Sequence, residues 1–369
     1  MPIFEKVLKK LEEKILLRSN KKYCVVTGNA TTGIYLAIKS LNLKKPKILM
    51  PNSVCHNVHL AILLSGGVPI FIDINRKNLG IDFLKLSKLK KPDVIISPHS
   101  YGNPCHINKI KKFCSDNRIV LIEDCALVSG AKIKKNFFGD FGDFSVFSFG
   151  KDKVMDLDFG GAVLTNDYKT YSQIKLSVLK LKNLSKNQSD AIYKINKDFK
   201  YIYNKYFIEN QSKQISNKYK EKIIKKSKNL LFKLNANQVK TIYKKFNTID
   251  ELITKKINKY NKISEIYKKY NFKKIKHLKN TKFSIPWKFN LIIMKKRNII
   301  FKELLENNFS ISSWYAPNNL FISKNIKYKN FKNSYFISDH ILNIPLNKNY
   351  QYYIKIFSKL KKFENANSQ

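Results

Sequence analysis

Arginine is scarce in this chain. Only four of the 71 basic residues are arginine, so the formal net charge of +45 comes almost entirely from lysine. Proteins that read bases and phosphates specifically favour the guanidinium group. Asparagine, isoleucine and tyrosine are abundant together with lysine, which indicates compositional bias with charge on solvated faces. The charge therefore predicts no specific nucleic-acid partner, although it favours capture of anionic ligands and weak association with anionic membranes.

Cysteine is also sparse, and its spacing excludes two kinds of site. The count is odd and no pair has the C-x-x-C spacing, so neither a disulfide framework nor a zinc site is indicated. His56 and His59 lie three residues apart without an evident third ligand, and we expect no metal site. The five cysteines are Cys24, Cys55, Cys105, Cys114 and Cys125.

Long apolar runs are missing as well. The longest ones, such as VHLAILL at 58–64, are far shorter than the roughly 20 residues that cross a bilayer. The N-terminal segment carries charges at a helical period and lacks an apolar stretch followed by a small-residue cleavage site. These absences predict a cytoplasmic protein without a transmembrane helix.

The chain does have enough apolar material for a large core. Apolar residues make up 43% of the 369 residues, which excludes a disordered polymer. Up to residue 166, short β-rich runs alternate with helical segments at 31–41, 54–65 and 107–116, which indicates an α/β unit with a mostly parallel sheet covered by helices. The seven predicted strands are 23–27, 47–50, 69–74, 93–98, 119–124, 144–149 and 161–166.

The second half of the chain has a different texture. Residues 168–234 are rich in Lys, Asn, Tyr and Ser, and we expect an irregular or helical surface excursion that contacts a partner subunit. A clear helical pattern returns at 236–270, and the tail mixes strands with helices. We therefore expect a large domain at 1–245 and a small C-terminal α+β domain at 246–369. The predicted tail elements are strands at 283–294 and 311–315 and helices at 296–307 and 351–362.

Three features fall at predicted strand ends, where ligands collect in open parallel sheets. Asp124 ends a very apolar strand, where a carboxylate requires a cation or a strong donor. The stretch GNATTG at 28–33 is a small-residue turn that opens a helix, and a helix N-terminus favours phosphate. Lys151 and Lys153 follow another strand and precede a glycine pair at 160–161 that we expect to be flexible.

Each feature alone has a commoner structural explanation. A strand-end acid is often a helix cap, a glycine turn is usually only a turn, and a lysine is nearly always a surface residue. Together, however, they meet the needs of pyridoxal phosphate. That cofactor requires a lysine that forms an imine with it, a carboxylate that keeps the pyridine nitrogen protonated, and a phosphate cup. The combination predicts a pyridoxal-phosphate enzyme.

The same segments resemble the DegT/DnrJ/EryC1/StrS sugar aminotransferases, which are pyridoxal-phosphate enzymes of fold type I. The resemblance runs from about residue 24 to residue 346 and is most convincing in its first half. It implies a three-layer large domain with a seven-stranded, mostly parallel sheet, followed by a small C-terminal α+β domain. It rests on NATTG leading into IYLAI, on the segment 51–55, and on SGGVPIFIDI, PHSYG, IEDCALVSGA, GDFGDFSVFSFGKDKVMDLDFGG, WYAP and IPL.

The resemblance also implies roles for individual residues. The lysine that bonds the cofactor is Lys153, not Lys151, because Lys153 stands five residues after Ser148 and seven before Gly160. Asp124 would pair with the pyridinium nitrogen.

Phosphate binding would fall to Ser148 and to the region of Thr31 and Thr32. Cys55 stands where many relatives stack an aromatic side chain on the cofactor ring.

Three positions depart from the family pattern. Leu127 stands where a glutamine is usual, Ser129 where a histidine is common, and Phe159 where an acid often precedes the glycine pair. None of these changes removes the lysine or the carboxylate. They bear on the substrate and on the tuning of the cofactor.

The resemblance implies an aminotransferase that moves an amino group from an amino acid, with glutamate expected, to a keto sugar nucleotide. Surface polysaccharide or lipopolysaccharide synthesis is the setting that the family implies, and a homodimer is expected. Two alternatives stay open. One is a pyridoxal-phosphate-dependent sugar dehydratase or deoxygenase, although such relatives usually replace the lysine. The other is a noncatalytic binding protein of the same fold.

Overall fold

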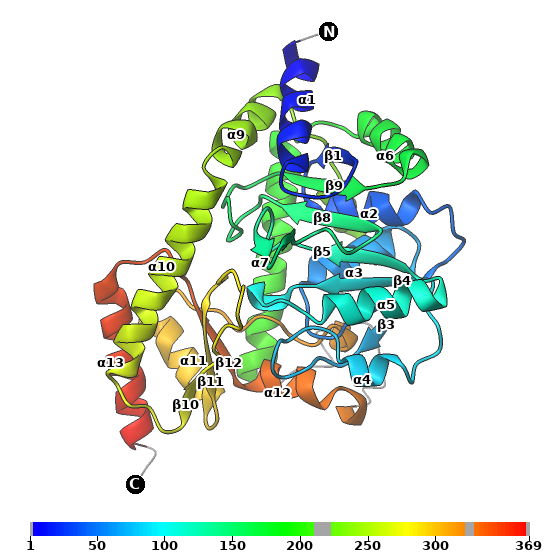
Figure 1. The fold of residues 1–369 in the computed structure, drawn as a ribbon. Coiled ribbons are helices and arrows are strands. Elements are labelled where there is room, and N and C mark those ends of the chain that lie inside the picture. The colour runs from blue at the N-terminus through cyan, green and yellow to red at the C-terminus, as the bar shows by residue number, and fades with distance from the viewer. Residues whose placement is uncertain (1–2, 210–222, 322–327, 367–369) are drawn as a thin grey trace.

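A seven-stranded sheet forms the centre of the larger part of the molecule (Figure 1). The computed structural model describes residues 3–209, 223–321 and 328–366. The strand order is β1-β9-β8-β5-β4-β2-β3, and every strand is parallel to the others except β9, which is antiparallel to both of its neighbours. The strands are β1 (Tyr23–Thr27), β2 (Lys47–Pro51), β3 (Val68–Ile72), β4 (Val94–Pro98), β5 (Val120–Asp124), β8 (Phe144–Ser148) and β9 (Gly161–Thr165).

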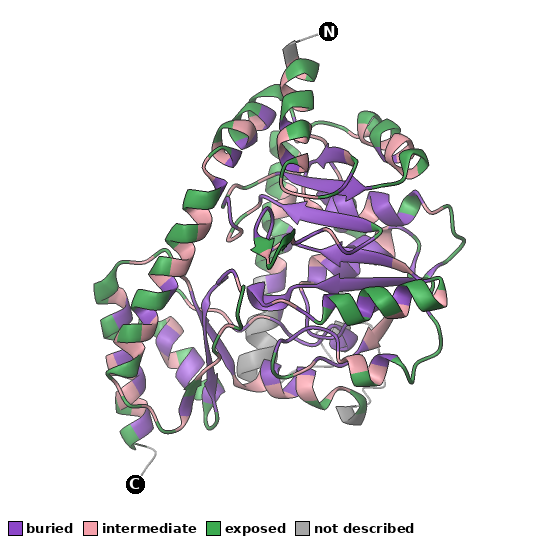
Figure 2. Cartoon of the chain, in the orientation of Figure 1, coloured by how far each residue is buried: buried purple, intermediate pink, exposed green. Residues whose placement is uncertain are grey.

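Helices cover both faces of this sheet, because successive apolar side chains of a strand point to opposite faces. Val94 and Ile96 of β4 pack in the core on one face, and Ile95 packs in the core on the other. Figure 2 shows the strands buried and the outer side of α5 exposed. Helices α2 (Ala30–Lys39), α3 (His56–Leu64) and α6 (Tyr168–Lys180) cover the first face, and α1 (Ile3–Leu16), α5 (Ile107–Asn117) and α9 (Ala236–Phe246) cover the second. The predicted three-layer arrangement is confirmed.

The parallel strands deliver their carboxyl ends to one edge of the sheet. Pro98 at the end of β4 pairs with Asp124 at the end of β5. Ser148 ends β8 at the same edge and pairs with Gly161, where the antiparallel β9 begins. All the strand-end features singled out in the sequence therefore meet at this edge.

The segment after the large sheet is helical. Besides α6 it contains α7 (Lys186–Glu209) and the 3-10 turn η3 (Ser227–Leu230), while residues 210–222 of the predicted excursion lie outside the described residues. Phe199 of α7 packs with Leu60 of α3 in a core cluster that η3 completes with Leu230. The excursion is thus packed against the large sheet's own helices along part of its length.

A second, antiparallel sheet of three strands organises the C-terminal part, as expected of a small α+β unit. Its core is built with three helices, among them α10, which follows α9 after a break at Asn247 and Thr248. The strands are β10 (Ile275–His277), β11 (Phe289–Ile293) and β12 (Ile341–Ile344), and the helices are α10 (Ile249–Lys268), α11 (Arg297–Glu306) and α13 (Tyr350–Ala366). The remaining elements are α4 (Phe83–Leu86), β6 (Lys132–Ile133), β7 (Asn136–Phe137), α12 (Lys332–His340), η1 (Ser100–Gly102), η4 (Asn318–Phe321) and η5 (Tyr328–Phe331).

The two parts are tied together at the far edge of the large sheet. Asp73, just beyond β3, is buried and accepts hydrogen bonds from the backbone N–H and the hydroxyl of Ser334 on α12, both 2.8 Å long. We propose residues 1–245 and 246–369 as two domains because each sheet has its own core, with the hinge at the α9–α10 break. Limited proteolysis that cut first inside either sheet would argue against this division.

Three expectations need correction. Residues 283–288 form no strand, and in 311–315 the only pairing is an isolated bridge between Ser312 and Asn343. The glycine pair is tightly packed rather than flexible, because a Cβ on Gly161 would lie 2.6 Å from the backbone carbon of Asn29. Among residues 3–209, 223–321 and 328–366, no helix combines the length and the apolar character that spanning a bilayer requires.

Candidate active site

Asp124 is a buried carboxylate at the end of β5. Its Oδ1 accepts the backbone N–H of Ala126 at 3.0 Å, which fixes the side chain at the turn that follows the strand. Burial raises the pKa of Asp124, and the positive charge of Lys153 opposes that rise. A carboxylate in such a place is stabilised by a cation, and the structure brings Lys153 to it.

Lys153 lies on the loop that joins β8 to β9. Its side chain is half-buried, and its backbone N–H bonds the carbonyl of Gly150 at 3.2 Å. Burial raises the pKa of the Cys55 thiol and of Asp124, and the charge of the Lys153 ammonium is close enough to lower both pKa values. Lys151, two residues earlier, is exposed. The structure therefore separates the two lysines by environment.

The turn before α2 leads directly into the N-terminus of that helix, and the side chains around it have different partners. Asn29 caps the helix by accepting the N–H of Thr32 at 2.8 Å, and the Thr32 hydroxyl donates to the carbonyl of Leu230 at 3.0 Å. The backbone N–H and the hydroxyl of Thr32 are thus both hydrogen-bonded within the protein. Thr31 is buried in the same first turn. A helix N-terminus of this kind favours an anion such as phosphate.

Ser148 and Ser129 link the ends of two neighbouring strands. The Ser129 hydroxyl donates to the carbonyl of Cys125 at 2.9 Å and accepts the backbone N–H of Ser148 at 3.0 Å. The hydroxyl of Ser148 accepts the N–H of Gly150 at 3.5 Å, at the start of the lysine loop. The serine at position 129, noted above as a departure, therefore fastens the Asp124 turn to the Lys153 loop.

The other departures lie in apolar surroundings. Leu127 is buried in a cluster with Tyr101 and Trp287. Phe159, on the same loop as Lys153, packs against the core. Burial lowers the pKa of His56 to about 3, so this imidazole beside Cys55 is neutral, and it stacks on Phe199 with ring centroids 3.5 Å apart.

Glu123, next to Asp124, points to the opposite face and has a structural role. Its oxygens accept the backbone N–H groups of Gly139 at 2.8 Å and Phe141 at 2.9 Å, and it bonds His99 Nε2 at 2.9 Å. His99 Nδ1 accepts the N–H of Cys105 at 3.3 Å, which puts the ring proton on Nε2 facing Glu123. Burial would raise the pKa of Glu123, but these donors outweigh it and hold the pKa below its usual value.

Among the described residues, one group of buried side chains has the spacing of metal ligands, and it includes His99 and Glu123. Donor atoms of His99, Glu123 and Cys125 lie within 4.8 Å of one another. Because the Glu123 carboxylate is already surrounded by protein donors, the group serves the fold without an ion.

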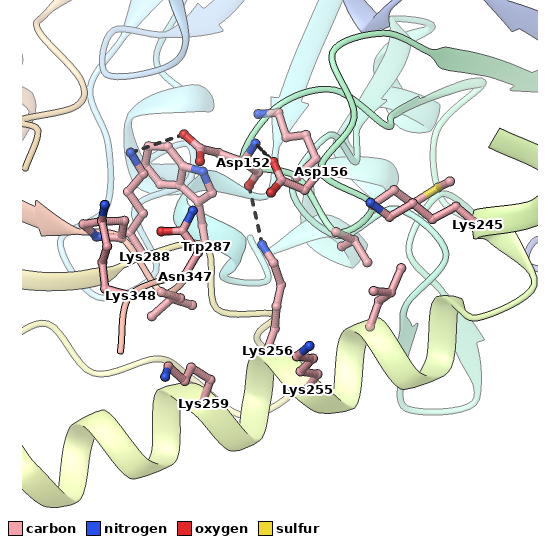
Figure 3. A pocket seen from close by; sticks show the side chains of 16 residues that line it. Asp152, Asp156, Lys245, Lys255, Lys256, Lys259, Trp287, Lys288, Asn347 and Lys348 are labelled. Atoms are coloured by element: carbon pink, nitrogen blue, oxygen red, sulfur yellow. Dashed lines mark hydrogen bonds and ion pairs between the residues drawn. The ribbon is translucent and has the colours of Figure 1, made fainter. Parts of the chain in front are cut away.

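A cavity of about 400 Å³ opens on the other side of Lys153, between the lysine loop and the C-terminal part (Figure 3). Asp152, Asp156 and Trp287 also line it. Figure 3 shows side chains from α10 and from the loops around residues 288 and 347 converging on it. We call it the lysine pocket, and its lysines are Lys153, Lys245, Lys255, Lys256, Lys259, Lys288 and Lys348.

The sequence reasoning missed this pocket. Lysine is so common in the chain that Lys256 and Lys288 carry no signal of their own, and the α10 wall comes from residues about 100 positions beyond Lys153. Trp287, one of only two tryptophans, is the one residue whose rarity marked the region.

The donor set fits pyridoxal phosphate. A buried carboxylate, a nearby lysine, hydroxyl groups and a helix N-terminus lie at the same sheet edge. Of the residues predicted from the sequence, Asp124 and Cys55 are close enough to Lys153 for its charge to lower their pKa values, and Ser148 lies at the start of the loop that carries Lys153. Thr31 lies on the first turn of α2, whose preceding turn packs on Gly161 beside Ser148.

Comparison with known proteins gives consistent results. The DegT/DnrJ/EryC1/StrS aminotransferase family profile matches residues 5–352. The chain is similar to GDP-perosamine synthase of Escherichia coli O157:H7, with 29% identity over 169 residues, or 45% of this chain and 46% of that relative. The matched stretch is thus less than half of the relative's length.

Solved structures share the fold across nearly the whole chain. Helicobacter pylori PseC, an aminotransferase of pseudoaminic acid biosynthesis, superposes with a TM-score of 0.73 at 17% identity, covering 98% of this chain and 91% of that one. A putative sugar aminotransferase of Streptococcus pneumoniae in its PMP form gives a TM-score of 0.73 at 16% identity, covering 98% and 90%. The fold of this chain is fold type I of the pyridoxal-phosphate enzymes.

Proposed function

Because this chain belongs to the DegT/DnrJ/EryC1/StrS aminotransferase family, we propose that it is a pyridoxal-phosphate-dependent aminotransferase that transfers an amino group from an amino acid, with glutamate as donor, to a keto sugar nucleotide. The observation that carries the proposal is that Asp124 ends β5 and Lys153 follows the neighbouring parallel strand β8, so both residues lie at the carboxyl edge of the sheet. The similarity to a GDP-perosamine synthase supports a nucleotide-sugar substrate. The proposal includes a role in building surface polysaccharide or lipopolysaccharide, which is the setting that the family resemblance implies.

The residues of the edge divide the work of holding the cofactor. Lys153 would hold it through its amine, and Asp124 would keep a proton on its pyridine nitrogen. Ser148, Thr31 and the first-turn N–H groups of α2 would bind its phosphate, and Cys55 lines the same space from the start of α3. When bound, pyridoxal phosphate supplies an electron sink for the bonds broken at the reacting carbon.

Lys153 also has the position of the general base and acid. Its Nζ is tethered on a short loop facing the buried carboxylate, so it can take a proton from one carbon and return it to another without diffusing. Asp124 cannot take that role while it is committed to the ring nitrogen. Lys153 would therefore move the proton between the reacting carbons, and Asp124 would hold the proton on the ring nitrogen.

The direct test is an activity assay. Purified protein loaded with cofactor, incubated with glutamate and a panel of keto sugar nucleotides, should release 2-oxoglutarate in step with an amino sugar. Loss of the sugar hydroxyl without 2-oxoglutarate release would identify a dehydratase instead. Cofactor-loaded protein that changes no keto sugar nucleotide with any of the common amino acids would contradict the proposal.

The proposal includes a homodimer. Leu176 and Leu179 on α6 are each 60% exposed, and Tyr193 on α7 is 69% exposed, which leaves apolar area on the two helices of the excursion. We expect a second copy of the chain to cover it. Light scattering after gel filtration should give twice the chain mass of 43.2 kDa, and a monomer at all concentrations would contradict this part of the proposal.

We also propose a cytoplasmic location. All five cysteines are free thiols, and the reducing cytoplasm preserves such thiols. Recovery of the protein mainly outside the cytoplasmic fraction of its host cell would oppose this.

A further inference from the structure

The lysine pocket carries far more positive than negative charge. Seven lysines line it against two aspartates, Asp152 and Asp156, a formal surplus of five charges around one cavity of about 400 Å³. Like charges gathered on the walls of one cavity raise each other's energy, and a bound anion relieves that cost. The surplus is local, because the lysines come from α9, α10 and three separate loops rather than from one basic run.

One of these lysines is buried, another is half-buried, and both contact Asp152. Lys288 is only 7% exposed, and its Nζ lies 3.5 Å from Asp152 Oδ2 and 3.2 Å from the Ser312 hydroxyl. Lys256 Nζ donates to the backbone carbonyl of the same aspartate at 3.5 Å (Figure 3). Burial lowers the pKa of Lys256 to about 8. Both contacts are long, so the carboxylate of Asp152 compensates the two ammonium groups incompletely.

Trp287 adds an unused donor. It is 6% exposed, its ring stacks on Tyr315 with an interplanar angle of 4°, and among the described residues its Nε1–H has no hydrogen-bond partner. Figure 3 shows the indole beside Asp152 and Lys288. A buried N–H next to unmatched cations fits a ligand with several acceptor oxygens and more than one negative charge.

We propose that the lysine pocket binds the diphosphate group of the nucleotide-sugar substrate, and that Asp152 is an internal anion which this diphosphate displaces. The inference rests on the proposed function for the identity of the ligand. Lys153 lines both the pocket and the Asp124 space, so a diphosphate held by Lys256 and Lys288 places the attached sugar at the reacting amine.

Asp152 has the geometry of a replaceable partner. It is half-buried with a side chain 42% exposed, and its backbone has a positive φ of 63°, anchored by its N–H on Asp156 Oδ1 at 2.7 Å. Its side chain can therefore leave Lys288 for solvent while the backbone stays fixed. Asp152 directly precedes Lys153. A ligand that displaces the Asp152 side chain therefore acts one residue away from the residue that carries the reacting amine.

Calorimetric titration of the cofactor-loaded protein with inorganic pyrophosphate tests the proposal without turnover. We expect Lys256→Met and Lys288→Met each to weaken pyrophosphate binding roughly tenfold or more, as loss of a charged hydrogen-bonding partner does. Lys268→Met is the matched control, since it removes the same charge from an exposed position on the same helix. Asp152→Asn should tighten binding about threefold or more, because it removes the competing carboxylate.

Four outcomes would overturn the inference. One is equal binding by Lys256→Met and Lys268→Met, which would mean diffuse attraction to the basic surface. Another is unchanged or weaker binding by Asp152→Asn. The third is displacement of pyrophosphate by equimolar 2-oxoglutarate, which would make the pocket a site for the carboxylates of the amino donor. The fourth is a protein that transfers amino groups but does not bind pyrophosphate. That result would contradict this inference and leave the proposed function intact.

Discussion

Replacement of Lys153 by alanine should abolish the near-visible absorbance band of the cofactor-loaded protein and lower amino transfer by roughly 10³-fold or more, within the range that a general base and acid contributes. The loss is expected because the variant lacks both the amine that holds the cofactor and the group that moves the proton. Absorbance spectra before and after borohydride reduction, together with 2-oxoglutarate release, provide the measurement.

Lys151→Ala is the matched control for this prediction. It removes the same charge two residues away from an exposed side chain, so spectrum and rate should stay within about twofold of the parent protein. Lys153→Arg separates charge from reactivity, since it keeps a cation facing Asp124 and Cys55 but cannot bond the cofactor. Full activity in Lys153→Ala, or loss of the band in Lys151→Ala alone, would show that the wrong lysine was chosen.

The neighbouring acids Glu123 and Asp124 should respond to amide substitution in opposite ways. Glu123→Gln is expected to lower the free energy of unfolding by about 3 kcal/mol, because the buried carboxylate accepts hydrogen bonds from His99 and from three backbone N–H groups, and an amide cannot accept all of them. The new amide group would also face the N–H groups of Phe141 and Gly142, which now donate to the carboxylate at 2.9 and 3.1 Å. Chemical denaturation at neutral pH measures the change.

Asp124→Asn should instead keep or raise stability and lose activity. Burial raises the pKa of Asp124, so the fold does not benefit from its charge, and the amide oxygen still accepts the N–H of Ala126. Amino transfer should fall by roughly 10²-fold or more, as when one electrostatic partner of a reacting group is removed. A stable Glu123→Gln protein, or an unfolded Asp124→Asn protein, would reverse the assignment of the two carboxylates.

Glu123 also predicts a pH dependence of the stability. The pKa of Glu123 is lower in the folded protein than its ordinary value of 4.5. Its contribution to stability is therefore complete above that value and is lost as the pH falls through the folded pKa. Glu123→Gln should lack this part of the acid destabilisation, so the difference in stability between the parent protein and the variant should shrink below about pH 4.

The large sheet was predictable because its strands are short apolar runs with turn residues between them, and all seven were placed correctly to within about two residues. The tail was harder. Residues 311–315 are apolar and aromatic enough for a strand, but two of their backbone groups bond Tyr101 and not a neighbouring strand. The Tyr101 hydroxyl donates to the carbonyl of Trp314 at 2.6 Å and accepts the N–H of Tyr315 at 3.0 Å. A tertiary contact across more than 200 residues has no local signal.

The site divides in the same way. Asp124 and Lys153 were found because strand ends and a family pattern mark them, whereas the lysine pocket depends on where α10 lies relative to the loop. In a chain with so much lysine, neither composition nor spacing distinguishes Lys256 or Lys288 from Lys268. Their burial against Asp152 is what sets them apart.

The reversed direction of β9 has one more effect on Lys153. Since Ser148 pairs with Gly161, the 12 residues between them form a closed hairpin connection pinned at both ends by ladder hydrogen bonds, unlike the long crossovers that join the parallel strands. Three residues of this connection are buried in the core of the large sheet, namely Phe149, Val154 and Met155. Inserted residues would therefore disturb that packing and lower the melting temperature at the same time as they moved the amine, so the length of the connection is fixed by the fold as well as by the chemistry.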